Sequence, residues 1–208
     1  MNEKPTARAK LLDAALQVIR AQGYSATSVD DLCRAAGVTK GGFFHHFKSK
    51  EDLAVAAAGH FSTMAEGLFS NAPYRALDDP LDRLLAYIDF RRSILMGALP
   101  DFTCLLGTMV QETYDTHPEI RAACEKGISD HAATVETDIA EAMAKYGVSG
   151  PWTAESLGLY TQAVLQGAFI LAKAKRGPAI AEECVDHLRS YIEMIFAAPL
   201  SARFLQQT

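Results

Sequence analysis

Apolar residues recur every three or four positions along most of the chain, which is the spacing of one face of an α-helix. No segment has a pattern that predicts a β-strand. We therefore expect an all-α protein of about nine helices. The expected limits of these helices are residues 5–22, 29–36, 40–47, 50–71, 80–96, 101–114, 118–146, 154–176 and 180–198.

Capping signals define a very short helix in the N-terminal quarter of the chain. Gly37 can adopt the left-handed conformation that ends a preceding helix. Thr39 then supplies a side-chain oxygen that caps the next helix. Ser49 repeats this signal and starts a further helix at Lys50. The pattern predicts a helix of two turns between these two caps.

The two sides of this short helix differ in chemistry. A helix of two turns is not stable alone, so Phe43 and Phe47, four positions apart, are expected to anchor it to a core. The other side carries Lys40, Phe44 and His45. A short, anchored helix with cationic neighbours has the properties of a recognition helix that lies in the major groove of DNA.

A partner helix precedes the short one. Residues 28–31, Ser-Val-Asp-Asp, resemble a capping box, and apolar residues follow at helical spacing up to Ala36. Two helices joined by the three residues 37–39 form a helix-turn-helix motif.

The N-terminal part of the chain, from Ala7 to about Phe61, resembles the DNA-binding domain of TetR-family transcriptional regulators. The residues that carry this resemblance are Ala14-Ala15, Ile19 and Gly23-Tyr24 in the first helix, residues 27–32 and 35–38 around the second, and residues 40–41, 45–47 and 49–51 in and after the third. The resemblance implies a three-helix DNA-binding domain over residues 1–50. A helical domain for effector binding and dimerisation would then cover residues 51–208.

The resemblance also implies which residues contact an operator in double-stranded DNA. These are Ser28, Thr39, Lys40, Gly41, Gly42, Phe44, His45 and Lys50. Lys40 is the main candidate for reading base edges, whereas His45 and Lys50 are expected to bind phosphates. Gly41 and Gly42 permit close backbone approach without side-chain readout. Phe44 departs from the Tyr that the family usually has, so a hydroxyl contact to a phosphate is lost.

The distribution of charge supports a local DNA-binding surface. The whole chain of 208 residues has a net charge of −5. Residues 1–50 contain eight Lys or Arg and four Asp or Glu, a net charge of +4, so the remainder carries −9. A basic N-terminal segment on an acidic protein is typical of binding to phosphates at one site.

Other classes of protein find little support in the sequence. No apolar stretch follows the charged N-terminus, so we expect no secretory signal and a cytoplasmic protein. The longest uncharged run, residues 156–172, contains several polar side chains and predicts a buried helix and not a membrane span. Four cysteines show no metal-binding spacing and are expected to be reduced. His45 and His46 point about 100° apart on a helix and do not form a metal site. We expect no metal and no cofactor.

Small and apolar residues surround the helix expected after Thr153, which suggests burial on more than one side. We expect another subunit to cover the second side. The TetR resemblance implies a homodimer through the last two helices, and two-fold symmetry then implies a pseudo-palindromic operator.

A weaker resemblance concerns residues 102–112 and 117–121, which look like the body of a TetR branch that includes cysteine-based sensors of electrophiles or oxidants. Cys104 aligns with the sensing cysteine, whereas Thr103 and Thr108 depart from the usual Gly and Asn. Cys104 is expected in the first turn of its helix, where the helix dipole favours a thiolate, with Arg91 or Arg92 as the candidate cation. The alternative is that Cys104 is a small residue in a pocket wall.

A reversible small-molecule effector, apolar, aromatic or electrophilic, is the other source of a signal. The candidate residues for binding it are Met64, Leu68, Tyr87, Arg91, Cys104, Thr108, His131 and Gln166. His131 interrupts an apolar stripe, which indicates either a ligand contact or a hydrogen-bonded core histidine.

The sequence thus predicts a homodimeric repressor that an effector or a modification of Cys104 releases from DNA. An activator or an effector-independent DNA binder is the nearest alternative. A helical enzyme or carrier with a vestigial DNA-binding segment is a further one, although no nucleophile–base or carboxylate pair supports it.

Overall fold

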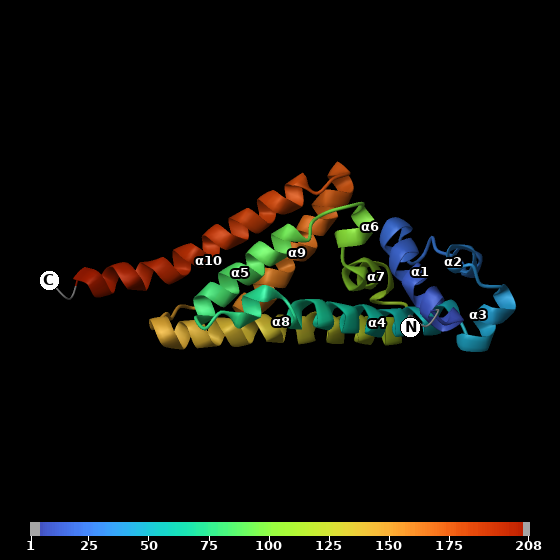
Figure 1. Ribbon diagram of the computed structural model, residues 1–208, viewed down its shortest axis with the longest axis horizontal. Coiled ribbons are helices and arrows are strands. Elements are labelled where there is room, and N and C mark those ends of the chain that lie inside the picture. The colour runs from blue at the N-terminus through green and yellow to red at the C-terminus, as the bar shows by residue number, and fades with distance from the viewer. Residues whose placement is uncertain (1–4, 206–208) are drawn as a thin grey trace. The chain divides into compact units, whose positions relative to one another are not determined.

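The computed structural model describes the backbone of residues 5–205 and the side chains of residues 5–197. Within these limits the chain forms ten α-helices and one 3₁₀ helix, and no strand (Figure 1). The helices are α1 (Ala7–Gln22), α2 (Val29–Ala36), α3 (Lys40–His46), α4 (Lys50–Ser70), η1 (Pro73–Ala76), α5 (Pro80–Ser93), α6 (Leu99–Phe102), α7 (Leu105–Thr113), α8 (Pro118–Tyr146), α9 (Ala154–Lys175) and α10 (Ala179–Leu205). The prediction of an all-α fold is confirmed.

The chain divides into two compact units that alternate along the sequence. Unit 1 contains the described residues up to 67 together with residues 98–128. Unit 2 contains residues 68–97 and the described residues from 129 onward. The helix-turn-helix therefore shares a unit with α6 and α7, which follow it far along the chain. The domain boundary predicted after residue 50 stays a prediction.

Unit 1 has one core to which all of its long segments contribute. α1 packs against α2, α3, α6 and α7. The buried side chains of this core include Leu11, Leu16, Ile19, Leu32, Phe43, Leu53, Leu105, Met109 and Ile120. The short helices α2 and α3 are thus held by burial against α1, as helices of this length require.

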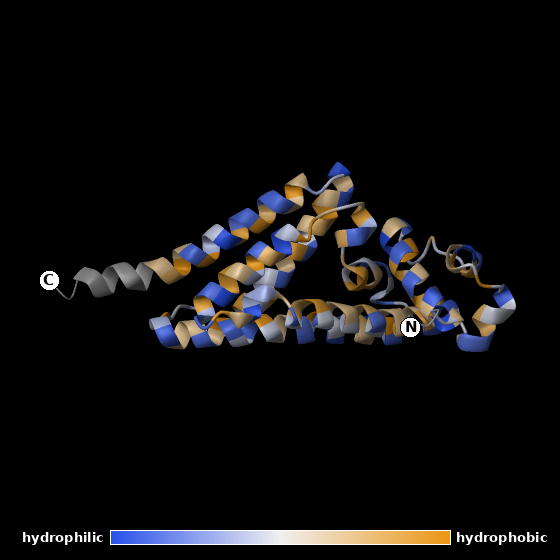
Figure 2. Cartoon of the chain, in the orientation of Figure 1, coloured by the Kyte–Doolittle hydropathy of each residue, from blue (hydrophilic) through white to orange (hydrophobic). Residues whose placement is uncertain are grey.

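Unit 2 is organised around the pairing of α10 with α9 and with α5. Its buried apolar side chains include Leu84, Ile88, Val135, Ile139, Leu165, Val185, Leu188 and Ile192. Phe196 on α10 is also buried. In Figure 2 apolar and polar positions both occur along α8 and α10, and part of the apolar positions is buried.

The prediction of a single helix over residues 101–114 is wrong. The structure has two helices there, α6 and α7, separated by Thr103 and Cys104. The guanidinium of Arg20 explains the break. It donates hydrogen bonds to the carbonyl oxygens of Thr103 (3.2 Å) and Asp101 (3.5 Å). In a continuous helix these carbonyls would accept from amides four residues later. Gly107 N–H instead points to the Sγ atom of Cys104 at 3.4 Å.

None of the helices in the described part of the chain is both long enough and apolar enough to cross a membrane.

Candidate functional site

The α2–α3 turn is fixed by local bonds that the sequence predicts. Gly37 has φ +62° and ends α2 in the left-handed region. Thr39 is the N-cap of α3, and its Oγ1 accepts a hydrogen bond from Gly42 N–H at 3.1 Å. These two residues set the direction in which α3 leaves α2, and therefore which side of α3 is exposed.

One side of α3 is anchored in the core of unit 1. Phe43 is completely buried and Phe47 almost so, with ring centroids 5.9 Å apart. The guanidinium carbon of Arg8, from α1, lies 5.4 Å from the centre of the Phe47 ring. The predicted anchoring role of both phenylalanines is confirmed.

The other side of α3 faces solvent and carries most of the predicted DNA contacts. Thr39, Lys40, Gly41, Phe44 and His45 are all exposed. Phe44 leaves 53% of its surface accessible, although its ring contacts that of Phe43 edge-on at 5.1 Å. An exposed aromatic ring beside a lysine and a histidine offers apolar and cationic contacts to one surface.

The two glycines of α3 have different environments. A Cβ atom on Gly42 would lie 2.9 Å from Val38 Cγ1, so a larger residue there would require the Val38 side chain to shift. A Cβ atom on Gly41 would meet nothing within 4 Å. Packing within the protein therefore does not explain Gly41, which leaves close approach of another molecule as a physical reason for it.

Lys40 forms an ion pair with Asp30 of α2, with 3.0 Å between Nζ and Oδ1. Both side chains are more than half exposed. An exposed pair of this kind contributes about 0–1 kcal/mol, so exchange of Asp30 for a DNA group costs little.

Lys50 is held more firmly. Its Nζ donates to the carbonyl oxygens of Tyr24 (3.0 Å) and Thr27 (2.9 Å) and lies 4.1 Å from the centre of the Tyr24 ring. Burial lowers the pKa of Lys50, and the nearby Glu112 opposes this effect. The ammonium thus joins the start of α4 to the α1–α2 connection. Its predicted contact with a phosphate stays a prediction and would use the remaining N–H.

Ser28 is exposed and caps α2. Its Oγ accepts from Asp31 N–H (3.1 Å) and donates to Asp31 Oδ2 (2.6 Å). Asp31 Oδ2 also accepts from Ser28 N–H at 3.0 Å, which completes a capping box. The predicted capping is confirmed, and its consequence is that the hydroxyl is already bonded within the protein.

Sequence reasoning missed Glu112, which stabilises the α1–α2 connection from α7. Its carboxylate accepts from the backbone N–H groups of Tyr24 (3.1 Å) and Ser25 (2.7 Å). Gly23 has φ +90°, and a Cβ atom at this position would collide with the Glu112 carboxylate. No local pattern indicates this contact, because 88 residues separate Tyr24 from Glu112.

Cys104 is the N-cap of α7, one residue before the first turn in which the sequence placed it. Its Sγ accepts weakly from Gly107 N–H, and its carbonyl accepts from the Thr108 hydroxyl at 2.9 Å.

The cation close to Cys104 within unit 1 is Arg20, whose pKa is lowered by burial and raised by the charges of Asp101 and Cys104. The expected partners, Arg91 and Arg92, belong to unit 2. Burial raises the pKa of neighbouring Cys124 to about 12, so that thiol stays protonated.

The predicted effector residues are divided between the two units. Met64, Cys104 and Thr108 belong to unit 1, and Leu68, Tyr87, Arg91, His131 and Gln166 to unit 2. Met64 and Leu68 are about half exposed. Thr108 is buried, whereas Gln166 is only partly so.

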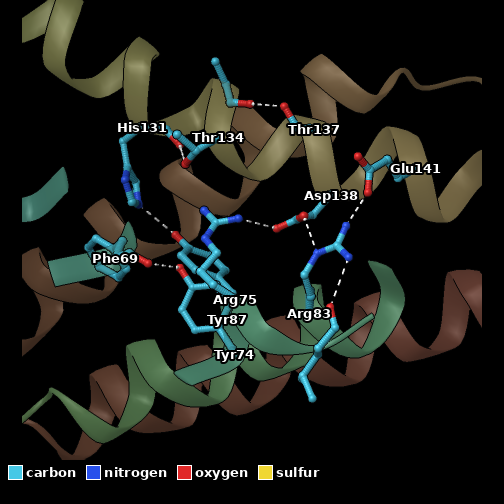
Figure 3. A network of polar contacts seen from close by, with 12 residues as sticks. Phe69, Tyr74, Arg75, Arg83, Tyr87, His131, Thr134, Thr137, Asp138 and Glu141 are labelled. Carbon is cyan, nitrogen blue, oxygen red and sulfur yellow. Dashed lines mark hydrogen bonds and ion pairs between the residues drawn. The ribbon is translucent and has the colours of Figure 1, made fainter. Parts of the chain in front are cut away.

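In unit 2, Tyr87 and His131 form the centre of an aromatic cluster. The Tyr87 hydroxyl lies 3.0 Å from His131 Nε2, and Figure 3 shows the two side chains pointing toward each other. Gln162 Nε2 donates a hydrogen bond to the same hydroxyl at 3.4 Å. The sequence did not predict this contact. The Tyr87 ring lies within 6 Å, centroid to centroid, of the rings of Phe69, Tyr74 and His131. The Phe69 ring lies 4.6 Å from that of His131.

The same cluster holds one neutral histidine and one arginine. Burial, together with the charges of Arg91 and Arg75, lowers the pKa of His131 to about 3. His131 is therefore uncharged at neutral pH and serves the Tyr87 hydroxyl as a neutral hydrogen-bond partner. The Arg91 guanidinium carbon lies 5.0 Å from the centre of the Phe69 ring and 6.0 Å from that of Phe169.

A second polar network supports this cluster. Asp138 is buried and binds Arg75 Nη1 at 3.0 Å and Arg83 Nε at 2.9 Å (Figure 3). Arg83 also pairs with Glu141. The network compensates the buried carboxylate and joins η1 and α5 to α8.

No group of three or more His, Cys, Asp or Glu side chains that could hold a metal ion occurs among the residues the structure describes.

Two family profiles match the chain. Residues 11–57 match the family described as bacterial regulatory proteins, tetR family. Residues 80–187 match the C-terminal domain of LmrA/YxaF-like transcriptional regulators. The first match covers the helix-turn-helix and the start of α4, and the second extends from α5 into α10.

Individual proteins are similar over different lengths. The transcriptional regulator AcuR of Cereibacter sphaeroides is 34% identical over 112 residues, which are 46% of this chain and 51% of AcuR. The HTH-type transcriptional repressor DhaR of a Mycobacterium species is 25% identical over 193 residues, 93% of this chain and 92% of DhaR. The chain thus spans about half the length of AcuR and nearly all of DhaR.

The fold also matches a solved structure. The crystal structure of a TetR transcriptional regulator from Chloroflexus aurantiacus superposes with a TM-score of 0.77 at 27% identity, covering 89% of this chain and 93% of that one.

Proposed function

This chain belongs to the TetR family of bacterial transcriptional regulators, and we propose that it is a homodimeric repressor of a pseudo-palindromic operator. An effector, or a modification of Cys104, releases it from DNA. Both matched families consist of transcriptional regulators, so the chain is a DNA-binding regulator and not an enzyme. Because its target is DNA, we place it in the cytoplasm.

The exposed side of α3 is the observation that carries the proposal for DNA binding. Phe43 and Phe47 are buried, so α3 presents its other side as a rigid surface. Lys40, with its weak ion pair to Asp30, is free to exchange that partner for a base edge. The contacts proposed are Ser28, Thr39, Lys40, Gly41, Gly42, Phe44, His45 and Lys50. Gly41 and Gly42 allow the backbone to approach, and Phe44 contacts sugar or a thymine methyl.

Exposed apolar side chains on the last two helices support dimerisation. Leu159, Tyr160, Ile170 and Leu171 on α9 and Met194 on α10 each leave at least 42% of their surface accessible. Clustered exposure of large apolar residues marks interaction surfaces, and α9 and α10 pack against each other. A second copy related by two-fold symmetry would cover these residues in a four-helix arrangement.

Two features support a response to a signal. The first is the aromatic cluster around Tyr87, Arg91 and His131 in unit 2, which has the composition of a small-molecule site. The second is Cys104, a partly exposed thiol at a helix N-terminus beside the Arg20 cation. Whichever signal weakens DNA binding must itself bind the DNA-bound form less tightly, because coupling is reciprocal.

Repression is proposed over activation because DhaR, similar over nearly the whole chain, is named a repressor. An activator or an effector-independent binder would share the same α3 surface and differ in its response to signals.

Selection of bound duplexes from a random DNA pool tests the proposal. We expect the selected sequences to contain two inverted half-sites with centres about one helical turn, or a multiple of it, apart. Selection of single half-sites, or of no sequence at all, would contradict the homodimeric DNA-binding proposal.

Fluorescence anisotropy on the selected duplex then tests the thiol. Binding should be abolished by N-ethylmaleimide in the wild type and unaffected by it in Cys104→Ser. If the reagent has no effect on the wild type, Cys104 is a structural residue and the signal is a reversible ligand.

A further inference from the structure

We propose that the effector of this regulator carries a carboxylate, and that Arg91 binds this group while the rings around it hold an aromatic or apolar body. The inference rests on the proposed function, because it assigns a ligand class to the cluster in unit 2.

Arg91 differs from the other arginines of unit 2 that pack between helices. Arg75 and Arg83 bind Asp138, Arg92 binds Glu182 and Asp186, and Arg189 binds Asp89 and Glu193. Among the side chains that the structure describes, no carboxylate pairs with Arg91. Asp89, two residues earlier on α5, is already bound to Arg189 at 2.8 Å.

The surroundings of Arg91 come from the interior of unit 2. Its guanidinium lies over Phe69 from α4 and Phe169 from α9, and both rings are at most 6% exposed. Its charge also acts on His131 from α8. A guanidinium that faces side chains from three other helices is directed inward, where a charge without a counter-ion is unfavourable.

The neighbouring polar groups do not supply that counter-ion. His131 is neutral, because burial and the Arg91 charge both oppose its protonation. The Tyr87 hydroxyl, at 3.0 Å from His131 Nε2, is likewise an uncharged group. These groups can donate or accept hydrogen bonds to a ligand but cannot balance the charge of Arg91.

A carboxylate matches this arrangement in shape and charge. The planar guanidinium fork binds a carboxylate through two parallel hydrogen bonds. Phe69 and Phe169 give this guanidinium aromatic surroundings, so we expect the rest of the ligand beside it to be apolar or aromatic. A neutral analogue of the same shape would leave the guanidinium uncompensated, so the structure predicts a preference for the acid.

Matched pairs of acid and amide test this inference on the full-length protein without DNA. The probes are benzoate and benzamide, phenylacetate and phenylacetamide, 3-phenylpropanoate and its amide, and butyrate and butyramide. Isothermal titration calorimetry measures each dissociation constant. We expect at least one acid to bind tenfold or more tightly than its amide. If no acid binds more tightly than its amide, the inference is wrong.

Three variants assign the preference to a residue. Arg91→Met keeps the apolar length of the side chain and should remove the preference for the acid. Arg91→Lys keeps the charge without the fork and should retain only part of it. Arg92→Met, in the adjacent position with its own carboxylate partners, is the matched control and should bind the acid as the wild type does. A preference that survives Arg91→Met would overturn the assignment.

The same samples separate this inference from the proposed function. If the wild type binds its selected duplex but shows no preference for any acid, only the ligand class is wrong. If it selects no duplex, the repressor proposal fails, and the acid-binding result still stands or falls by calorimetry.

Discussion

The two units of this protein place their chemistry in opposite ways. In unit 1 the proposed DNA contacts lie on the outside of α3, and the buried phenylalanines behind them only hold the helix in place. In unit 2 the proposed ligand contacts lie inside, on side chains from four helices. A surface for a polymer is built by local capping and one anchored face, whereas a site for a small molecule requires convergence of distant segments.

The cations of the two units show the same difference. In unit 1, Lys40 has an exposed carboxylate partner and Lys50 has two carbonyl partners. In unit 2, Arg91 has aromatic rings around it and, among described side chains, no carboxylate. An exposed lysine exchanges its partner at little cost, but a partly buried arginine without an anion favours binding of one.

The largest expected effect tests whether the α3 surface depends on its buried side. Phe43→Ala removes a fully buried ring and should destabilise unit 1 by about 3–5 kcal/mol. Chemical denaturation followed by circular dichroism measures the loss. Phe44→Ala, at the exposed neighbouring position, is the control and should change stability by less than about 0.5 kcal/mol. Equal losses in the two variants would contradict the division of α3 into an anchored and a free side.

The next prediction concerns Glu112, the α7 carboxylate that binds the α1–α2 connection. Glu112→Ala leaves the N–H groups of Tyr24 and Ser25 without this acceptor and should cost about 1–3 kcal/mol. Because these groups lie next to the start of α2, DNA affinity should fall as well. Anisotropy on the selected duplex checks the second effect.

Glu112→Gln sharpens this test, since it keeps one acceptor oxygen and should lie between the wild type and the alanine variant. DNA affinity that is unchanged in both variants would show that the α7 contact does not position the helix-turn-helix.

In unit 2 the neutral His131 predicts a pH dependence of stability. The pKa of His131 is about 3 in the folded protein and about 6.5 in the unfolded chain, so the unfolded state binds the proton first as pH falls. The contribution of neutral His131 to the free energy of unfolding is complete above pH 6.5 and declines as the pH falls toward 3. At pH 5 the free energy of unfolding is lower by about 2 kcal/mol.

His131→Gln should remove this part of the pH dependence, as measured by the free energy of unfolding at pH 7 and pH 5. His45→Gln, on the exposed side of α3, is the matched control and should keep it. If the free energy of unfolding falls equally between pH 7 and pH 5 in His131→Gln and in the wild type, another group causes the pH dependence.

The smallest effect on stability, with a clear effect on function, is expected at Gly41. Gly41→Ala adds a methyl group that meets nothing in the protein and should stabilise α3 slightly, by up to about 1 kcal/mol. If DNA approaches this backbone closely, affinity should fall about tenfold, which corresponds to about 1.4 kcal/mol.

Gly42→Ala should instead affect stability more than DNA affinity, because its Cβ would press on the Val38 side chain. Wild-type affinity in Gly41→Ala would exclude close approach of DNA at this glycine.

The sequence was sufficient for features that depend on neighbouring residues. Gly37, Thr39 and Ser28 cap as their spacing predicted, and Phe43 and Phe47 are buried. α5 begins at Pro80, as the predicted range did, and Asp79 caps it. Each of these features is decided by bonds within a few residues, so a linear pattern contains the information.

Other features depended on the tertiary structure. The sequence predicted one helix where Arg20 divides α6 from α7, and it suggested Arg91 or Arg92 where Arg20 is the charge next to Cys104. It gave no indication that Gln162 donates a hydrogen bond to the Tyr87 hydroxyl. It gave no indication of Glu112 at the α1–α2 connection.

The physical reason for this division is the range of the interactions. Helical periodicity and caps are satisfied within one or two turns, and they determine the fold class, the helix-turn-helix and the exposed side of α3. A hydrogen bond or ion pair between residues 80 or more apart depends on how helices pack. The sequence therefore determined that this protein has a DNA-binding surface. Only the tertiary structure decided which carboxylate bonds to the α1–α2 connection, which guanidinium separates α6 from α7, and which arginine of unit 2 has no carboxylate partner among the described side chains.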